Sequence, residues 1–142
     1  MRCDLFAVAE SSSIDITTNR LSIFHVWDDL TTPILPVVLP SLAVVAMFTR
    51  EQNEPDNVEL QIDVSFTGKT LAQFPLAVSF QSMLKTRFVA TIQGIVFSEQ
   101  GTYELAIHRG DESALGVWRI QVRLTPPEPH MQLVETAASP PP

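Results

Sequence analysis

The chain has 142 residues, which fits a single domain, because domains contain roughly 150 residues each. Nine basic and sixteen acidic residues give a formal charge of −7. This charge argues against nucleic acid and against anionic lipid as partners, since both are bound through clustered Lys and Arg. The apolar content of 45% is high enough for a packed core and excludes a disordered chain.

The cysteine content and the first residues favour an intracellular setting. Cys3 is the only cysteine, so no intrachain disulfide can form, whereas small secreted domains usually have several. The apolar run Leu5 to Ala9 is shorter than the roughly 7–15 apolar residues of a signal peptide. We therefore expect a cytoplasmic protein of bacterial type.

The first strands are predicted at Cys3 to Glu10 and at Leu21 to Asp28. The next stretch, Leu30 to Thr49, contains no charged residue and is long enough to span a membrane. Three prolines would break a helix there, so we predict no membrane segment. We expect instead a proline-rich loop over Leu30 to Ser41 and a buried strand over Leu42 to Phe48.

The second half of the chain alternates between apolar and polar residues, which is typical of half-buried strands. We predict strands at Val58 to Phe66 and Ala72 to Phe80, and a third at Phe88 to Phe97 with a bulge at Gly94. An antiparallel hairpin follows, formed by residues 103–108 and 117–124. No window shows the apolar repeat of a helix.

About eight strands joined by turns predict an all-β fold, an antiparallel two-sheet β-sandwich of immunoglobulin-like or C2-like type. Pro75 lies within a predicted strand and favours a sandwich with open edges over a closed barrel. We assign residues 1–125 to this domain. Six of the 11 prolines come after position 125, so residues 126–142 are predicted to be a flexible, proline-rich tail.

Two stretches resemble known families. The segment Glu99 to Leu105 is similar to the tyrosine corner of immunoglobulin-like domains, with Leu105 where those domains have their second cysteine. Physically, Gly101 supplies the turn, and Tyr103 buries its ring while its hydroxyl reaches a backbone carbonyl.

Over roughly residues 1–124 the layout also resembles a small bacterial family of unknown function. The resemblance is carried by Cys3-Asp4, by the spacing of Phe24 and Asp28, and by the Gly-x-Tyr at residues 101–103 before the last hairpin. The Gly-Lys that usually precedes the second strand of this family is replaced here by residues 18–20. The resemblance implies a β-sandwich and no particular activity.

The sequence contains no recognisable catalytic group. Serines 11–13 lack the nucleophile elbow of hydrolases, and His25 and His108 lie in strand patterns. Cys3 lies in an apolar strand, where burial raises the pKa of a thiol. We therefore expect neither an enzyme nor a cofactor.

Acidic residues suggest an alternative function as a ligand-binding or calcium-binding sandwich. Asp28 and Asp29 end one predicted strand, and Glu54 and Asp56 lie in a later connection. Calcium takes about 6–8 oxygen ligands, which a sandwich can collect from loops at one end. Calcium would then raise the melting temperature of the protein.

The main hypothesis is a protein-interaction role, as a homodimer or as an accessory subunit. Two predicted strands are apolar on both faces, although a sandwich strand turns only one face inward. The outward side chains would be His25 and Trp27 on one strand and Ala43, Val45 and Met47 on the other. An exposed apolar patch marks an interaction surface.

This hypothesis leaves one alternative open, in which the loop Leu30 to Ser41 covers the outward apolar face. If the face is instead a contact surface, Val45→Asp or Trp27→Ala should abolish association and leave the fold intact.

Overall fold

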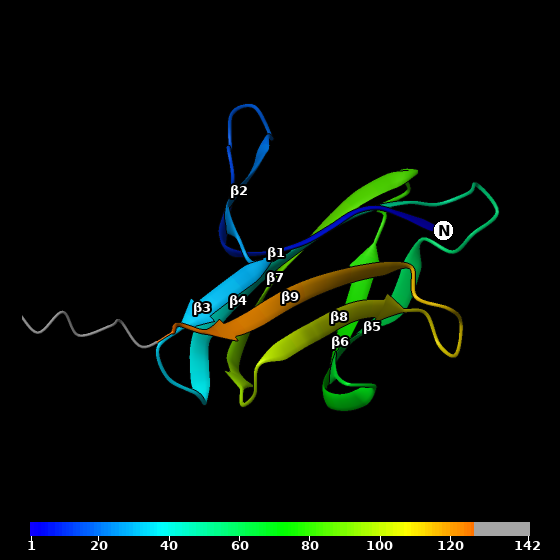
Figure 1. The fold of residues 1–142 in the computed structure, drawn as a ribbon. Coiled ribbons are helices and arrows are strands. Elements are labelled where there is room, and N and C mark those ends of the chain that lie inside the picture. The colour runs from blue at the N-terminus through cyan, green and yellow to red at the C-terminus, as the bar shows by residue number, and fades with distance from the viewer. Residues whose placement is uncertain (127–142) are drawn as a thin grey trace, which may run out of the picture.

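The computed structural model of the protein describes residues 1–126, and this part of the chain is all strand and loop (Figure 1). The predicted tail, 126–142, lies outside the described residues except for Pro126. Within residues 1–126 no helix occurs that could cross a membrane. The strands are β1 (Arg2–Ile14), β2 (Leu21–Val26), β3 (Asp29–Thr32), β4 (Val37–Thr49), β5 (Asn57–Phe66), β6 (Lys69–Ser79), β7 (Lys85–Phe97), β8 (Gly101–His108) and β9 (Gly116–Leu124).

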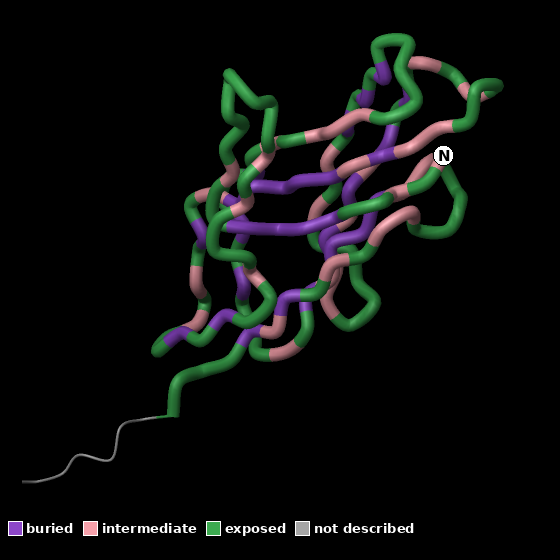
Figure 2. Tube along the Cα trace, turned by 90° about the horizontal axis from the view of Figure 1, so that it is seen from above, coloured by how far each residue is buried: buried purple, intermediate pink, exposed green. Residues whose placement is uncertain are grey.

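The strands form two sheets, which confirms the predicted β-sandwich. One sheet has four strands in the order β2-β1-β4-β7, and the other has five in the order β3-β9-β8-β5-β6. All neighbouring strands run antiparallel except β3 and β9, which are parallel. The core lies between the sheets, and Figure 2 shows the buried segments in the middle of the strands and exposed residues mainly in the loops.

The predicted strand over residues 21–28 is divided between the two sheets. β2 ends at Val26, and β3 begins in the other sheet at Asp29. Trp27 lies at this crossing, where its N–H donates to the Val8 carbonyl at 2.8 Å and its carbonyl accepts from Nε1 of Trp118 at 2.7 Å. Residues 1–126 therefore contain nine strands, where about eight were expected.

The predicted loop over Leu30 to Ser41 is also corrected. The greater part of it belongs to β3 and β4, and only residues 33–36 connect the two strands. Pro33 and Pro36 lie in this short connection, where a missing N–H costs no ladder hydrogen bond. The interruption of strand structure at these two prolines is therefore much shorter than the loop that was predicted over Leu30 to Ser41.

The tyrosine corner is formed as the sequence predicts. The Tyr103 hydroxyl donates to the Glu99 carbonyl at 3.0 Å and accepts from the N–H groups of Ser98 and Glu99, each at 3.1 Å. The ring is buried, stacked on Phe66 at 4.5 Å between ring centroids and edge-on to Phe97 at 4.6 Å. This corner joins the end of β7 to the start of β8, so it connects the two sheets.

A long β1–β2 hairpin extends beyond the sandwich, because β1 continues to Ile14 and not only to Glu10 as predicted. Residues 11–14 of β1 pair with residues 21–24 of β2, and the hairpin rises away from both sheets (Figure 1). At its tip the Asp15 carboxylate accepts from the N–H groups of Thr17 and Thr18 at 2.8 Å each. Asn19 adopts φ 55°, a conformation that asparagine tolerates. Asp15 and Asn19 were the turn signals that could have revealed this hairpin.

Candidate functional site

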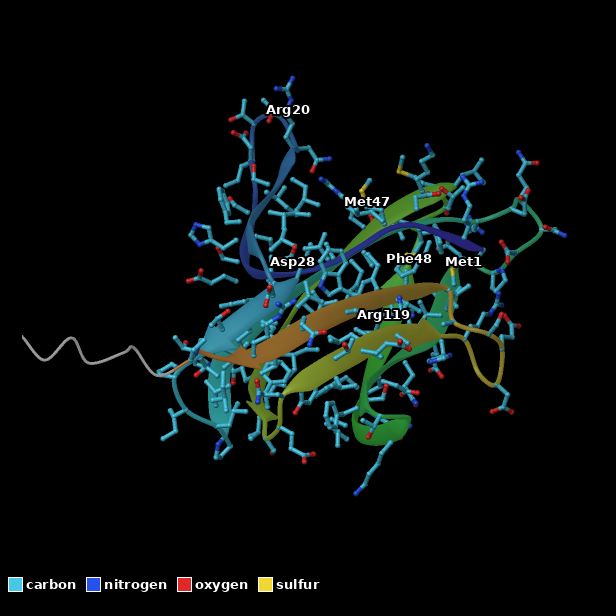
Figure 3. The ribbon with its side chains drawn as sticks, in the orientation of Figure 1. Met1, Arg20, Asp28, Met47, Phe48 and Arg119 are labelled. Carbon is cyan, nitrogen blue, oxygen red and sulfur yellow. The ribbon has the colours of Figure 1, made fainter. Side chains whose placement is uncertain are left out.

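A cleft of about 760 Å³ lies between the β1–β2 hairpin and the start of β7, and we call it the hairpin cleft. It opens on the face of the four-stranded sheet that is turned away from the core. Figure 3 shows Met47 beside the hairpin that carries Arg20 near its tip. The cleft is lined by residues of β1, the hairpin, β4, the end of β6, the β6–β7 loop and β7: Arg2, Asp4, Ile14, Asn19, Met47, Phe48, Ser79, Gln81, Met83, Lys85, Thr86, Arg87 and Val89.

The hairpin cleft is basic, although the whole chain carries a charge of −7. Arg2, Lys85 and Arg87 line it, which are three of the nine basic residues in the sequence. Among the described residues that line it, Asp4 is the only acidic one. Low-dielectric walls strengthen the field of such a local excess of one sign. The cleft therefore favours groups of negative charge.

Arg87 holds the hairpin in place over the cleft. Its guanidinium donates to the backbone carbonyl of Asn19 at 2.9 Å and to the side-chain oxygen of the same residue at 2.5 Å. This contact joins β7 to the hairpin tip, which is 68 positions away in sequence. The sequence pattern gave no signal for it, because both partners are polar residues that lie far apart in the chain.

Apolar side chains form part of the cleft wall. Ile14 of the hairpin, Met83 of the β6–β7 loop and Val89 of β7 are exposed by 44%, 64% and 40% respectively. Met47 lies half-buried among them. Exposed apolar side chains that are grouped in one cleft are typical of a binding surface.

Arg50 positions the loop that closes one side of the cleft. Its guanidinium donates to the carbonyls of Met83 at 2.9 Å and Glu54 at 2.7 Å, and it lies 3.1 Å from the Asp56 carboxylate. The side chain is only 10% exposed and also lies over the Phe80 ring at 5.3 Å. The structural role of Arg50 was not predicted from the sequence. Its position between an apolar strand and an acidic turn was the signal that could have indicated this role.

Asp4 at the rim of the cleft provides a pH test. Hydrogen bonds from the Thr49 hydroxyl and from Arg2 hold the pKa of the Asp4 carboxyl below its ordinary value of 3.8. A carboxyl with a lowered pKa in the folded state adds stability above its unfolded pKa and loses it as the pH falls through its folded pKa. We expect the free energy of unfolding to decrease below about pH 4, and to decrease less in Asp4→Asn. Urea unfolding at a series of acid pH values measures this, and Asp111→Asn is the control. If Asp4→Asn shows the same pH dependence of stability as the wild type, the prediction is wrong.

The interface hypothesis requires the outward side chains of β4 to be exposed, and the structure shows that most of them are buried. Ala43 and Val45 point away from the core but are 5% and 0% exposed, so the outer face of β4 is covered at these two positions. Val45 lies in register between Ala7 and Val89. Of the three β4 residues that were predicted to form the contact, only Met47 reaches the cleft.

The two predicted contact residues near β2 also lie elsewhere than expected. Trp27 is half-buried and packs against the core at the crossing between the sheets, with its Nε1 buried and without a hydrogen-bond partner within the described residues. His25 is exposed and its Nδ1 lies 2.7 Å from the Glu10 carboxylate. Neither residue lines the hairpin cleft.

The four acidic residues proposed as calcium ligands do not come together. Glu54 contacts the N-terminal ammonium group and Arg109, whereas Asp56 contacts Arg50 and the N–H of Ser82. Asp28 and Asp29 lie at the start of β3, and Figure 3 shows Asp28 well separated from Met1, which is bonded to Glu54. Within the described part of the chain no three His, Cys, Asp or Glu side chains are grouped to hold a metal. The prediction of a shared site for these four residues is wrong.

Comparison with known proteins adds a family. A model described as a family of unknown function (DUF6941) matches residues 4–123, which is nearly the whole sandwich. This confirms the resemblance to a small family of unknown function. No curated protein matches the sequence.

Proposed function

We propose that this chain, which belongs to the family of unknown function DUF6941, acts through protein contacts and not through catalysis. The contact surface in this proposal is the hairpin cleft. Its partner is a protein segment that carries both apolar and acidic side chains. The observation that supports this most strongly is the combination, in one cleft, of exposed apolar side chains and a local excess of positive charge.

Each part of the lining has a role in this proposal. Ile14, Met83 and Val89 would bury apolar side chains of the partner, at about 25 cal/mol per Å² of apolar surface removed from water. Lys85 would contact its carboxylates and contribute to orientation and association rate. Burial raises the pKa of the Cys3 thiol in β1, and a raised pKa disfavours the thiolate form that a nucleophile needs.

An immunoglobulin-like fold is part of this proposal. In chain order, β1, β4 and β7 would correspond to strands A, B and E, and β5, β8 and β9 to strands C, F and G, with β6 as strand C′. The tyrosine corner then lies between strands E and F, where immunoglobulin domains have it. Sandwiches of this type present loops and sheet faces for binding, which agrees with a contact role but does not identify the partner.

The experiment compares three variants of the full chain as baits in its native host. Met83→Asp and Lys85→Glu change the apolar and basic parts of the cleft, and Lys69→Glu makes the same charge change in β6, outside the cleft. The proposal expects a protein that binds the wild type and Lys69→Glu at least tenfold better than either cleft variant. Its purified complex should also weaken with added salt, because salt screens the contacts of Lys85.

Two results would contradict this proposal. One is a partner that binds all the variants equally, because its contact then lies outside the cleft. The other is an enzymatic turnover that one polar substitution in the described residues removes.

A further inference from the structure

One edge of the four-stranded sheet has no neighbouring strand within residues 1–126. β7 pairs with β4 along its whole length, and no strand of the described chain pairs with its other side. An open edge presents a row of backbone N–H and C=O groups to another strand, so proteins usually shorten, break or cover such edges. The open edge of β7 therefore requires an explanation.

The other three edge strands are protected in these ways. β2 has six residues, and its His25 adopts φ 53°, which breaks the extended backbone. β3 has four residues. β6 contains Pro75, which has no N–H to donate. β7 has 13 residues and no proline, so it is the longest edge strand in the described chain.

The regular part of β7 is the segment Lys85 to Gln93. The predicted bulge at Gly94 is not formed, because the register of β7 with β4 does not shift across it; its φ of 70° nevertheless interrupts the extended backbone and ends the regular part of the strand. The segment contains neither glycine nor proline, and its charged residues, Lys85 and Arg87, both lie at its beginning. This uneven placement of charge decides which partner strand fits.

We infer that β7 pairs with β7 of a second copy of this chain, antiparallel, around a two-fold axis near Val89. This register places Lys85 opposite Gln93 and Arg87 opposite Thr91, so that no two like charges face each other. At the axis, Val89 lies opposite the same residue of the second copy, and a pair of β-branched side chains is favourable in a sheet. A two-fold contact of this type is self-complementary and closes after two copies.

The surface beneath the same edge also favours this partner. A groove of about 330 Å³ opens between the two sheets beside β7. A second copy that extends the four-stranded sheet would bring its own β7 and its own groove to this opening, so apolar surface would meet apolar surface. The groove is lined mainly by the apolar residues Ile62, Phe74, Leu76, Phe88, Ala90 and Ile92.

Net charge opposes association of two copies, because each carries −7. The edge strand itself is positively charged, unlike the whole chain, since β7 contains two basic residues and no acidic one. The local field at the contact is thus opposite in sign to that of the whole chain, and this reduces the repulsion during approach. A second copy is therefore the partner that the length, charge placement and apolar groove of β7 fit.

The test measures the mass of the full chain in solution for the wild type, Val89→Lys and Val117→Lys. Val89 and Val117 are exposed by 40% and 38%, and β9, which carries Val117, lies inside the five-stranded sheet. Sedimentation at sub-millimolar concentration should give twice the 15.8 kDa of one chain for the wild type and for Val117→Lys. Val89→Lys should give the mass of one chain, because two lysines would meet at the axis.

Hydrogen exchange provides the second measurement. Amide protection in residues 85–93 should increase with concentration in the wild type and stay constant in Val89→Lys. A wild type that stays at 15.8 kDa overturns the inference, and so does a dimer that Val89→Lys leaves intact. Dimerisation that occurs only after residues 127–142 are removed would also overturn it. In that case the full chain's own C-terminal residues, and not a second copy, would occupy the edge of β7. The inference is separable from binding in the hairpin cleft, because Met83→Asp should leave the dimer unchanged.

Discussion

Replacing Val45 with aspartate is expected to unfold the domain. The side chain is 0% exposed in the middle strand of its sheet, and no basic residue lies beside it in register, where Ala7 and Val89 flank it. An uncompensated buried charge costs roughly 3–5 kcal/mol, a large part of the roughly 5–15 kcal/mol that stabilises a typical domain. Urea unfolding followed by circular dichroism should show a strongly lowered midpoint or no folded baseline.

Val117→Asp is the control for this change. Val117 is also a strand valine, in β9, but it is 38% exposed and lies outside the proposed β7 contact, so its carboxylate stays in water. We expect its unfolding midpoint to stay close to that of the wild type. If Val45→Asp unfolds at the wild-type midpoint while the protein loses a partner, the original interface hypothesis is right and the burial argument is wrong.

Replacing Tyr103 with phenylalanine is expected to lower the free energy of unfolding by about 2–4 kcal/mol. The ring keeps its contacts with Phe66 and Phe97, but the hydroxyl that bonds Ser98 and Glu99 is removed. Three backbone groups then lose their partner in a region that is partly closed to water. Thermal unfolding should show a decrease in Tm of roughly 10 °C for a domain of this size.

Glu99→Ala is the control at the same corner. The hydroxyl of Tyr103 bonds the backbone of Glu99 and not its side chain, so this variant keeps all three hydrogen bonds. Its stability should be close to that of the wild type. Equal losses in the two variants would show that the corner depends on the loop sequence and not on the tyrosine hydroxyl.

Much of the fold could be predicted from local pattern. Alternation with period two depends only on the geometry of an extended chain, so it located the strands at residues 58–66 and 117–124 to within one or two positions. The tyrosine corner was also predictable, because Gly101 and Tyr103 act within a few residues of their partners. The hairpin from β1 to β2 was missed because its polar residues 11–13 do not alternate with apolar ones.

The candidate site was less predictable, because it depends on which strands become neighbours. Sequence alone shows that Val45 points opposite to Val44, but not that both side chains are buried in the fold. In the same way, the chain order does not show that Glu54 meets Arg109 while Asp29 lies with Arg123 at 3.7 Å. Three of the four carboxylates that appear available for calcium in the sequence, those of Asp29, Glu54 and Asp56, are paired with basic residues in the fold.

The sequence by itself determined that this protein is a β-sandwich with a tyrosine corner, because both follow from interactions over short distances along the chain. Tertiary structure alone decided which surfaces are available for the proposed contacts. The hairpin cleft requires Arg87 to contact Asn19 across 68 positions, and the open edge of β7 depends on which strand comes last in its sheet. Such contacts are set by packing of the whole domain, which no local pattern records.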